Sequence, residues 1–270
     1  MKPYRYFKAI AKLGLRGSFL KNIVAFIFVS MLPTLFMLIP EKFQITGYKF
    51  LYISIPVIFV IIPCFRMGAI GFLFDSLSKK KTSLGNIFDG FKYFLKLIPL
   101  GITKILSVIP LVLAGYYMLN AISPETMELL TEFAENPMEN QKLIEAISSQ
   151  EIVKMYISEI AVITAFVIAI IVTAYTSLTE YIIYNEQMSG FKSLIKSIKL
   201  MKGHILYYIG FNLSFILWYL ASAFTMGISG VIVAPYKEAS FIIFYDYLRF
   251  LNGEKNMPED IEEQNETLEE

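Results

Sequence analysis

Long apolar runs separated by short polar segments dominate the chain. An α-helix needs about 20 apolar residues to cross the hydrocarbon core of a bilayer, and six runs approach or exceed that length. The pattern therefore predicts an all-α, polytopic membrane bundle that forms a single integral membrane domain over residues 1–251. The six expected spans are residues 23–39, 50–74, 97–119, 157–184, 205–224 and 231–250.

Three of the polar segments carry lysines and arginines on one helical face and apolar residues on the other. They lie in residues 1–21, 84–96 and 188–202. A helix with this pattern favours the membrane interface, although a disordered basic arm is an alternative for residues 1–21. We expect each such helix to precede a hairpin of two spans, so that the chain comprises three hairpins. Whether the hairpins are true repeats stays open.

Charge is distributed very unevenly over the connecting segments. With the N-terminus inside the cell, seventeen lysines and arginines fall on the cytoplasmic side and four on the outer side. Because basic residues accumulate in cytoplasmic loops, we expect both termini to be cytoplasmic. Residues 120–153, with seven glutamates and one lysine, then form an external acidic insert. The acidic tail, residues 252–270, has the composition of a disordered cytoplasmic segment.

Composition supports lipid as the solvent and excludes several kinds of site. Hydrophobic residues make up 56% of the chain and charged residues 17%, against about 25% charged in soluble domains. The single cysteine, Cys64, permits no intramolecular disulfide, and the single histidine, His204, cannot supply a histidine-rich metal site. The glycine-rich nucleotide-binding motifs and the hydrolase nucleophile motif are missing. We therefore expect no cofactor, no metal and no nucleic-acid partner.

The most informative residues are charges inside the predicted spans. A charged side chain at the centre of a span costs about 2.5–3.5 kcal/mol on insertion scales, so each requires a partner or water. We expect Arg66 to pair with Glu238, with Glu180 as the alternative partner nearer the cytoplasm. Lys237 is adjacent to Glu238 but points to a different helix face. The candidate intramembrane polar cluster is Arg66, Glu180, Lys237 and Glu238.

The stretch Ser197–Leu248 resembles the C-terminal signature of an uncharacterised integral membrane family of Firmicutes, a domain of unknown function. The resemblance covers about a fifth of the chain in detail. It implies a multi-pass protein of the bacterial cytoplasmic membrane, and it implies no activity. The positions that carry it are Ser197, Met201, Lys202, Gly203, Ser214, Trp218, Pro235, Tyr236 and Tyr245.

Charge within the spans, without a recognisable catalytic set, favours a non-enzymatic role. The protein would transport, or interact with, a membrane amphiphile or an envelope partner. Two alternatives remain: a membrane-embedded enzyme that acts on a lipid headgroup with Glu180 or Glu238 as its base, and a structural subunit of a membrane complex. The expected partners are the bilayer itself, anionic lipids of the inner leaflet, and a membrane protein that the sequence does not identify.

The orientation can be tested by cysteine labelling in a Cys64→Ser background. An impermeant thiol reagent added to intact cells should label Thr131→Cys, in the acidic insert, and should not label Ser83→Cys, beside the lysine-rich segment. Labelling of Ser83→Cys without labelling of Thr131→Cys would invert the topology.

Overall fold

The structure is a computed structural model that describes residues 1–42, 58, 61–120 and 149–254. Every regular element in these ranges is a helix, which confirms the all-α class. Four helical segments here are long and apolar enough to cross a membrane: Leu84–Leu119, Val153–Glu186, Ile205–Phe224 and Ile228–Leu251. A fifth arises if Tyr4–Gly14 and Phe19–Leu32, bent by 101° at their junction, form one span. Several helices able to span a membrane are therefore present. Of the expected second span, residues 50–74, the part at residues 50–57 and 59–60 lies outside the described residues.

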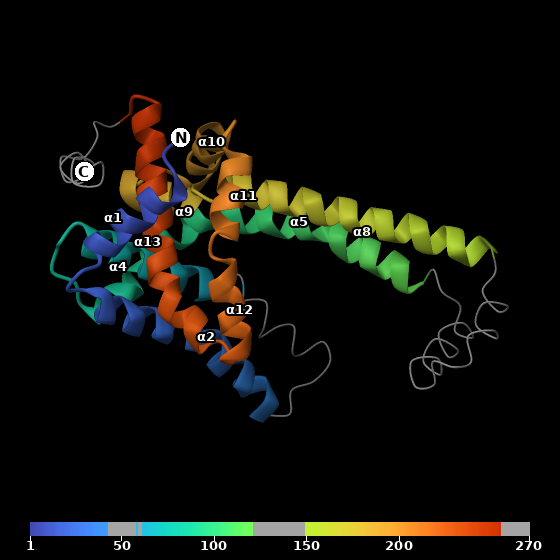
Figure 1. Ribbon diagram of the computed structural model, residues 1–270. Coiled ribbons are helices and arrows are strands. Elements are labelled where there is room, and N and C mark those ends of the chain that lie inside the picture. The colour runs from blue at the N-terminus through green and yellow to red at the C-terminus, as the bar shows by residue number, and fades with distance from the viewer. Residues whose placement is uncertain (43–57, 59–60, 121–148, 255–270) are drawn as a thin grey trace. The chain divides into compact units, whose positions relative to one another are not determined.

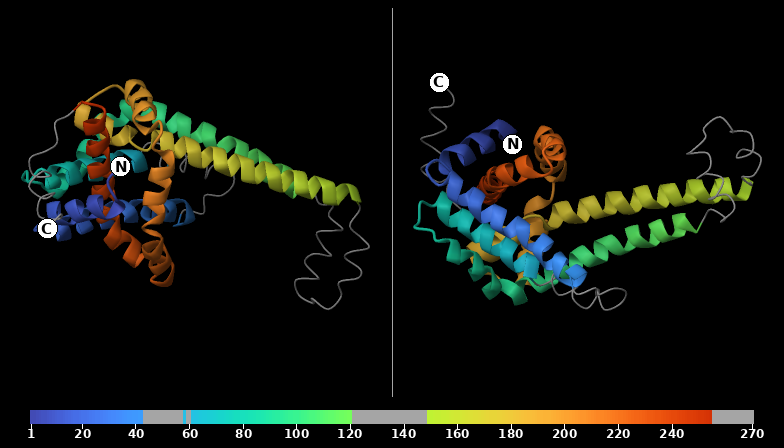
Figure 2. Two further views of the ribbon diagram at one scale, coloured as in Figure 1. Left: turned by 45° about the horizontal axis from the view of Figure 1, so that its top comes forward. Right: turned by 90° about the horizontal axis from the view of Figure 1, so that it is seen from below.

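The chain divides into two compact units, Met1–Gly101 with Tyr175–Glu270, and Ile102–Ala174. Figures 1 and 2 show their helices from three directions. The helices α5 (Phe94–Leu119) and α8 (Ser149–Thr176) supply the second unit. The first unit contains α1 (Tyr4–Gly14), α2 (Phe19–Lys42), α4 (Ile62–Leu77), η2 (Leu84–Tyr93), α9 (Thr179–Glu186), α10 (Gly190–Met201), α11 (Ile205–Leu213), α12 (Ile216–Phe224) and α13 (Ile228–Leu251).

The core of the first unit forms around α13, which contacts α1, α2, α4 and α12 (Figure 1). Phe7 on α1 is fully buried, and its ring centroid lies 5.6 Å from those of Phe211 on α11 and Phe244 on α13. Ile10 and Ala11, on the same side of α1, are also buried. This apolar face was expected to meet lipid, and the structure instead packs it against protein.

The other two basic helices are also partly covered by protein. On α10, Leu194 and Met201 are buried, whereas Phe191, Ile195 and Ile198 are exposed. The segment expected at residues 84–96 is not a separate α-helix, because the 3₁₀ helix η2 continues directly into α5 at Phe94. Contact of these helices with the membrane interface stays a prediction.

Close backbone contact between α4 and η2 depends on two glycines. A Cβ atom at Gly68 would lie 1.7 Å from the carbonyl oxygen of Ile87, and one at Gly90 would lie 1.8 Å from that of Cys64. In lipid, helix association depends on van der Waals packing and small interfacial residues, since lipid chains are as apolar as the side chains they meet. Gly68 and Gly90 therefore set the distance between these two elements.

The helices of the second unit expose large apolar side chains along most of their length. Ile102, Leu106 and Val112 on α5 and Ile160 and Ile163 on α8 are all more than half exposed, as expected for surfaces in contact with lipid. The buried residues described in this unit are small. Apart from Ala174, they lie seven apart on each helix: Ser107 and Ala114, Ser158 and Ala165. Because α8 begins at Ser149, the end of the expected insert is helical, while residues 121–148 lie outside the described range.

Two spans that the sequence predicts as continuous are interrupted. The fourth breaks between α8 and α9, where the hydroxyl of Ser197 donates to the Tyr175 carbonyl at 2.7 Å and accepts from the Leu178 N–H at 3.2 Å. The fifth breaks between α11 and α12, where Lys8 donates to the Ser214 carbonyl at 2.8 Å. Irregular backbone at membrane depth requires such protein partners, so these side chains stabilise the breaks.

Substitution of Gly90 by alanine should destabilise the protein because the added methyl group collides with the backbone of α4. Overpacking typically costs about 1–3 kcal/mol, which a lower melting temperature of the detergent-solubilised protein would report. The matched control is Gly85→Ala in the same helix, where the nearest atom to the new Cβ, the Ser83 Oγ, lies at 3.8 Å. Equal melting temperatures for the two variants would contradict this account of the contact.

Candidate functional site

Three helices of the first unit each contribute a charged residue to one polar cluster. The Arg66 Nε on α4 lies 2.9 Å from Glu180 Oε2 on α9, and its Nη2 lies 3.4 Å from Glu238 Oε1 on α13. The second oxygen of Glu238 accepts a 2.7 Å hydrogen bond from the hydroxyl of Tyr181. One guanidinium thus joins residues that lie 114 and 172 positions away in the chain.

Local sequence explains how each helix presents its charge. Pro63 lies in the first turn of α4, where the missing N–H needs no partner, and Arg66 follows within the same turn. Glu180 belongs to the first turn of α9, immediately after the break that Ser197 stabilises. Glu238 follows the buried Pro235 within α13. All three charges therefore lie close to a proline or a helix break.

Burial differs sharply among the three side chains. Glu180 is 7% exposed and Glu238 is 16% exposed, whereas Arg66 retains 50% of its side-chain accessibility. The two carboxylates are covered by protein and hold the guanidinium from one side, while the rest of the Arg66 side chain remains accessible. The cluster therefore presents an oriented cation whose side chain stays partly accessible.

Lys237, the fourth candidate, lies apart from these contacts. Its ammonium group donates to the hydroxyl of Tyr219 on α12 and lies 5.0 Å from the centre of that ring. Consecutive residues of a helix point to different faces, which explains why Lys237 and Glu238 have different partners. Sequence reasoning missed Tyr181, whose only signal was its position beside Glu180.

A second ionic cluster joins α9, α10 and the end of α13. Lys196 lies 2.8 Å from Glu186 and also pairs with Glu254, while the hydroxyl of Tyr245 donates to Glu186 at 2.7 Å. Burial by itself lowers the pKa of Lys196, but the two carboxylates outweigh it, and the pKa lies above the ordinary lysine value. Lys196 therefore stays charged and holds these elements together.

A family model described as "Protein of unknown function (DUF975)" matches residues 1–252, which include every residue of the Arg66 cluster. The chain belongs to this family. No curated protein and no solved structure matches the chain. Membership of DUF975 agrees with the expected domain of unknown function, while the Firmicutes origin and the individual signature positions stay predictions.

In this member of DUF975, the structure gives most of the nine candidate signature residues a role in the fold, through burial, a side-chain hydrogen bond or an unusual backbone conformation. Gly203 has a φ of +84°, a conformation that favours glycine, directly after α10. Met201, Pro235 and Tyr245 are buried, and Tyr236 is half-buried against Phe215. The side chains of Ser197 and Ser214 bond backbone carbonyls at or beside the helix breaks. The side chains of Lys202 and Trp218 are exposed, so they are available to lipid or to a partner.

The ion-pair geometry predicts an order of stability among variants. Arg66→Gln removes the cation from two largely buried carboxylates, and breaking such a pair typically costs about 3–5 kcal/mol. Glu238→Gln should cost less, because Arg66 keeps its shorter contact with Glu180. Lys237→Gln is the matched control for loss of one charge on α13. Melting temperature and the yield of monodisperse protein report the effects.

The charge swap Arg66→Glu with Glu238→Arg should recover part of the yield lost in the single variants. A swap no better than its worse single variant, or a Glu238→Gln protein as unstable as Arg66→Gln, would contradict the proposed role of Arg66 as the shared partner.

Proposed function

We propose that this chain is a non-enzymatic membrane transport protein that binds a membrane amphiphile at the Arg66 cluster. The observation that carries the proposal is the geometry of Arg66: two covered carboxylates orient the guanidinium of a side chain that remains half exposed. Charge at membrane depth requires a partner or water. Here the two carboxylates supply the partner and orient the guanidinium, and the accessible part of the side chain can meet a ligand.

The placement of the cluster supports a transport role. Its residues come from α4, α9 and α13, which are the second helices of the three expected hairpins. Transporters built from repeated units place their substrate sites where the units meet, near the middle of the membrane. In this proposal, six spans form three hairpins with both termini in the cytoplasm of a bacterial cell, and the helices that return to the cytoplasm converge on the ligand site.

The interrupted helices give a second line of support. Discontinuous spans are common around transporter sites, where irregular backbone lines a cavity or is covered by protein. Here the α8–α9 break lies immediately before Glu180, and Pro235 lies three residues before Glu238. Both carboxylates therefore lie on helix segments next to a break or a proline, where a small movement disrupts few backbone hydrogen bonds.

The chemistry of arginine restricts the ligand. A guanidinium donates hydrogen bonds and accepts none, so the polar group that meets Arg66 must offer acceptor oxygens, such as those of a phosphate, a carboxylate or an ester. The carboxylates of Glu180 and Glu238 are engaged by Arg66, and Glu238 also by Tyr181. This engagement favours a binding site over the general base that the lipid-headgroup enzyme hypothesis requires.

A lipid inventory tests the proposal. The protein is purified gently in polymer-bounded native nanodiscs, and the lipids that remain with it are quantified by mass spectrometry against the bulk membrane. We compare the wild type with the triple variant Arg66→Gln, Glu180→Gln, Glu238→Gln, which removes the site without leaving an unpaired buried charge. We expect one amphiphile class to be enriched in the wild type and depleted at least fivefold in the triple variant.

Lys237→Gln serves as the control and should keep the enrichment, because its side chain contacts Tyr219 instead of the cluster. Unchanged enrichment in the triple variant, or no enrichment in any sample, would refute ligand binding at Arg66. A stoichiometric companion protein in place of an amphiphile would favour the structural-subunit hypothesis.

A further inference from the structure

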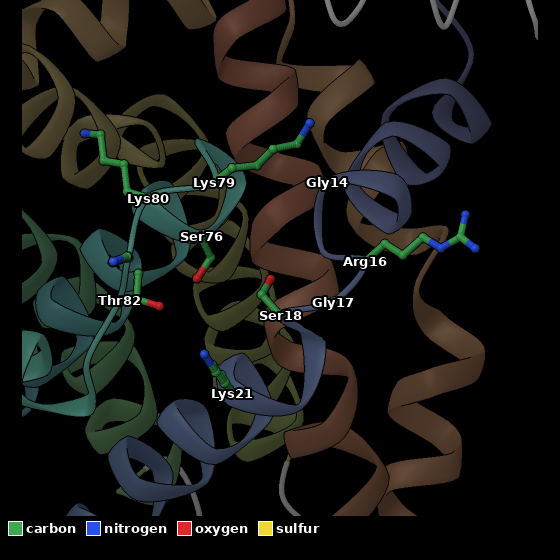
Figure 3. A pocket seen from close by; sticks show the side chains of 10 residues that line it. Gly14, Arg16, Gly17, Ser18, Lys21, Ser76, Lys79, Lys80 and Thr82 are labelled. Atoms are coloured by element: carbon green, nitrogen blue, oxygen red, sulfur yellow. The ribbon is translucent and has the colours of Figure 1, made fainter.

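A basic cavity lies at the end of the first unit where the α1–α2 turn meets the segment after α4. Its volume is about 500 Å³, within the range of roughly 300–1,000 Å³ typical of small-molecule sites. Residues 14–21 form one wall and residues 76–82 the other (Figure 3). The two segments are distant in sequence, and both belong to the regions that the charge pattern assigns to the cytoplasmic side.

The charge around this cavity has one sign. Its five ionisable lining residues, Arg16, Lys21, Lys79, Lys80 and Lys81, are all cations. Lys80 pairs with Asp75 at 3.2 Å, and the other four form no ion pair with a carboxylate of the described residues. Clustered cations that lack counter-ions attract anions, and low-dielectric walls strengthen this field.

The backbone around the cavity also favours an anion. The helix α2 begins at Phe19, and the first N–H groups of a helix lack intrahelical partners and attract negative charge. The opposing end of α4 would repel an anion, but three of its last four carbonyls are occupied: those of Phe74, Asp75 and Ser76 accept from the N–H groups of Ser78, Lys80 and Lys79, respectively.

A buried hydroxyl in the wall lacks a partner. Ser76 is only 5% exposed, and its Oγ makes no hydrogen bond in the structure. Figure 3 shows its oxygen, with those of Ser18 and Thr82 and the ammonium of Lys21, directed towards a common space, while Arg16, Lys79 and Lys80 extend outwards. A buried hydroxyl without a partner destabilises the folded protein, and a ligand that accepts its hydrogen bond would offset that cost.

We propose that this cavity binds a phosphate group, with the Ser76 hydroxyl and Lys21 as its inner contacts and the outer lysines as its attracting rim. An anionic lipid headgroup and a free phosphate ion present the same acceptor oxygens to this site, and the test below distinguishes them. The site is separate from the Arg66 cluster and does not depend on the function proposed for it.

Melting of the purified protein in an uncharged detergent tests the site, since a ligand that binds only the folded state raises the melting temperature. The probes are sodium phosphate and short-chain phosphatidylglycerol, each compared with sodium chloride at equal ionic strength and with short-chain phosphatidylcholine. A rise with both probes identifies the bare phosphate group as sufficient, whereas a rise with phosphatidylglycerol alone identifies a lipid headgroup.

Two pocket variants are compared with the wild type, and a control pair removes the same number of positive charges as the pocket lysine pair. Ser76→Ala and the pair Lys21→Gln with Lys81→Gln should each raise the half-saturating probe concentration about tenfold, the effect of losing one hydrogen bond to a charged group. The pair Lys192→Gln with Lys199→Gln, on the exposed face of α10, should respond as the wild type does.

Ser76→Ala distinguishes two roles of the hydroxyl, contact with the ligand and stabilisation of the fold, because they predict opposite changes in melting temperature and in the response to the probe. A ligand contact predicts an unchanged or higher melting temperature without probe and a weaker response with it. A lower melting temperature without probe, combined with a full response, would overturn the proposal. Equal responses of all variants, or no rise beyond that of sodium chloride, would also overturn it.

Discussion

The ion pairs of Arg66 with Glu180 and Glu238 connect three helices of the first unit. A single arginine at membrane depth costs several kcal/mol unless it is neutralised or hydrated. Its contacts with Glu180 and Glu238 join α4 to α9 and α13, although each of these carboxylates lies more than a hundred residues from Arg66 along the chain. The same contacts orient the guanidinium while part of the Arg66 side chain stays accessible, so the stabilising interaction and the candidate site involve the same residues.

The packing around this cluster follows from the absence of a hydrophobic driving force between helices in lipid. Close approach takes its place: Gly68 and Gly90 allow the backbones of α4 and η2 to touch. Polar side chains complete the bundle at the points where helices break, with Ser197 between α8 and α9 and Lys8 between α11 and α12. The basic helix α1 is therefore part of the core, since Phe7 and Lys8 both contact other helices of the bundle.

The first unit contains two polar regions of different chemistry. The Arg66 cluster balances a cation against two covered carboxylates, which suits selective recognition of a polar group within the membrane. The cavity between residues 14–21 and 76–82 has an excess of positive charge and a buried hydroxyl without a partner, which suits capture of a phosphate group. The two proposed ligand sites therefore differ in chemistry and belong to the same unit of the fold.

The sequence by itself determined the helical class, the membrane as solvent and the residues that had to find partners, because apolar run length and the cost of buried charge are local properties. Arg66, Glu180 and Glu238 could be singled out since each lies in an apolar run. Tertiary structure alone decided that Arg66 binds both carboxylates and that Lys237 turns to Tyr219, because partner choice depends on which helix faces meet. It also decided that the apolar face of α1 packs on protein, since lipid and a neighbouring helix favour the same residues. The breaks at Ser177 and Ser214 could not be predicted from hydropathy, which depends only on the composition of each span. The hydrogen bonds that stabilise these breaks come from Ser197 and Lys8, which lie elsewhere in the chain.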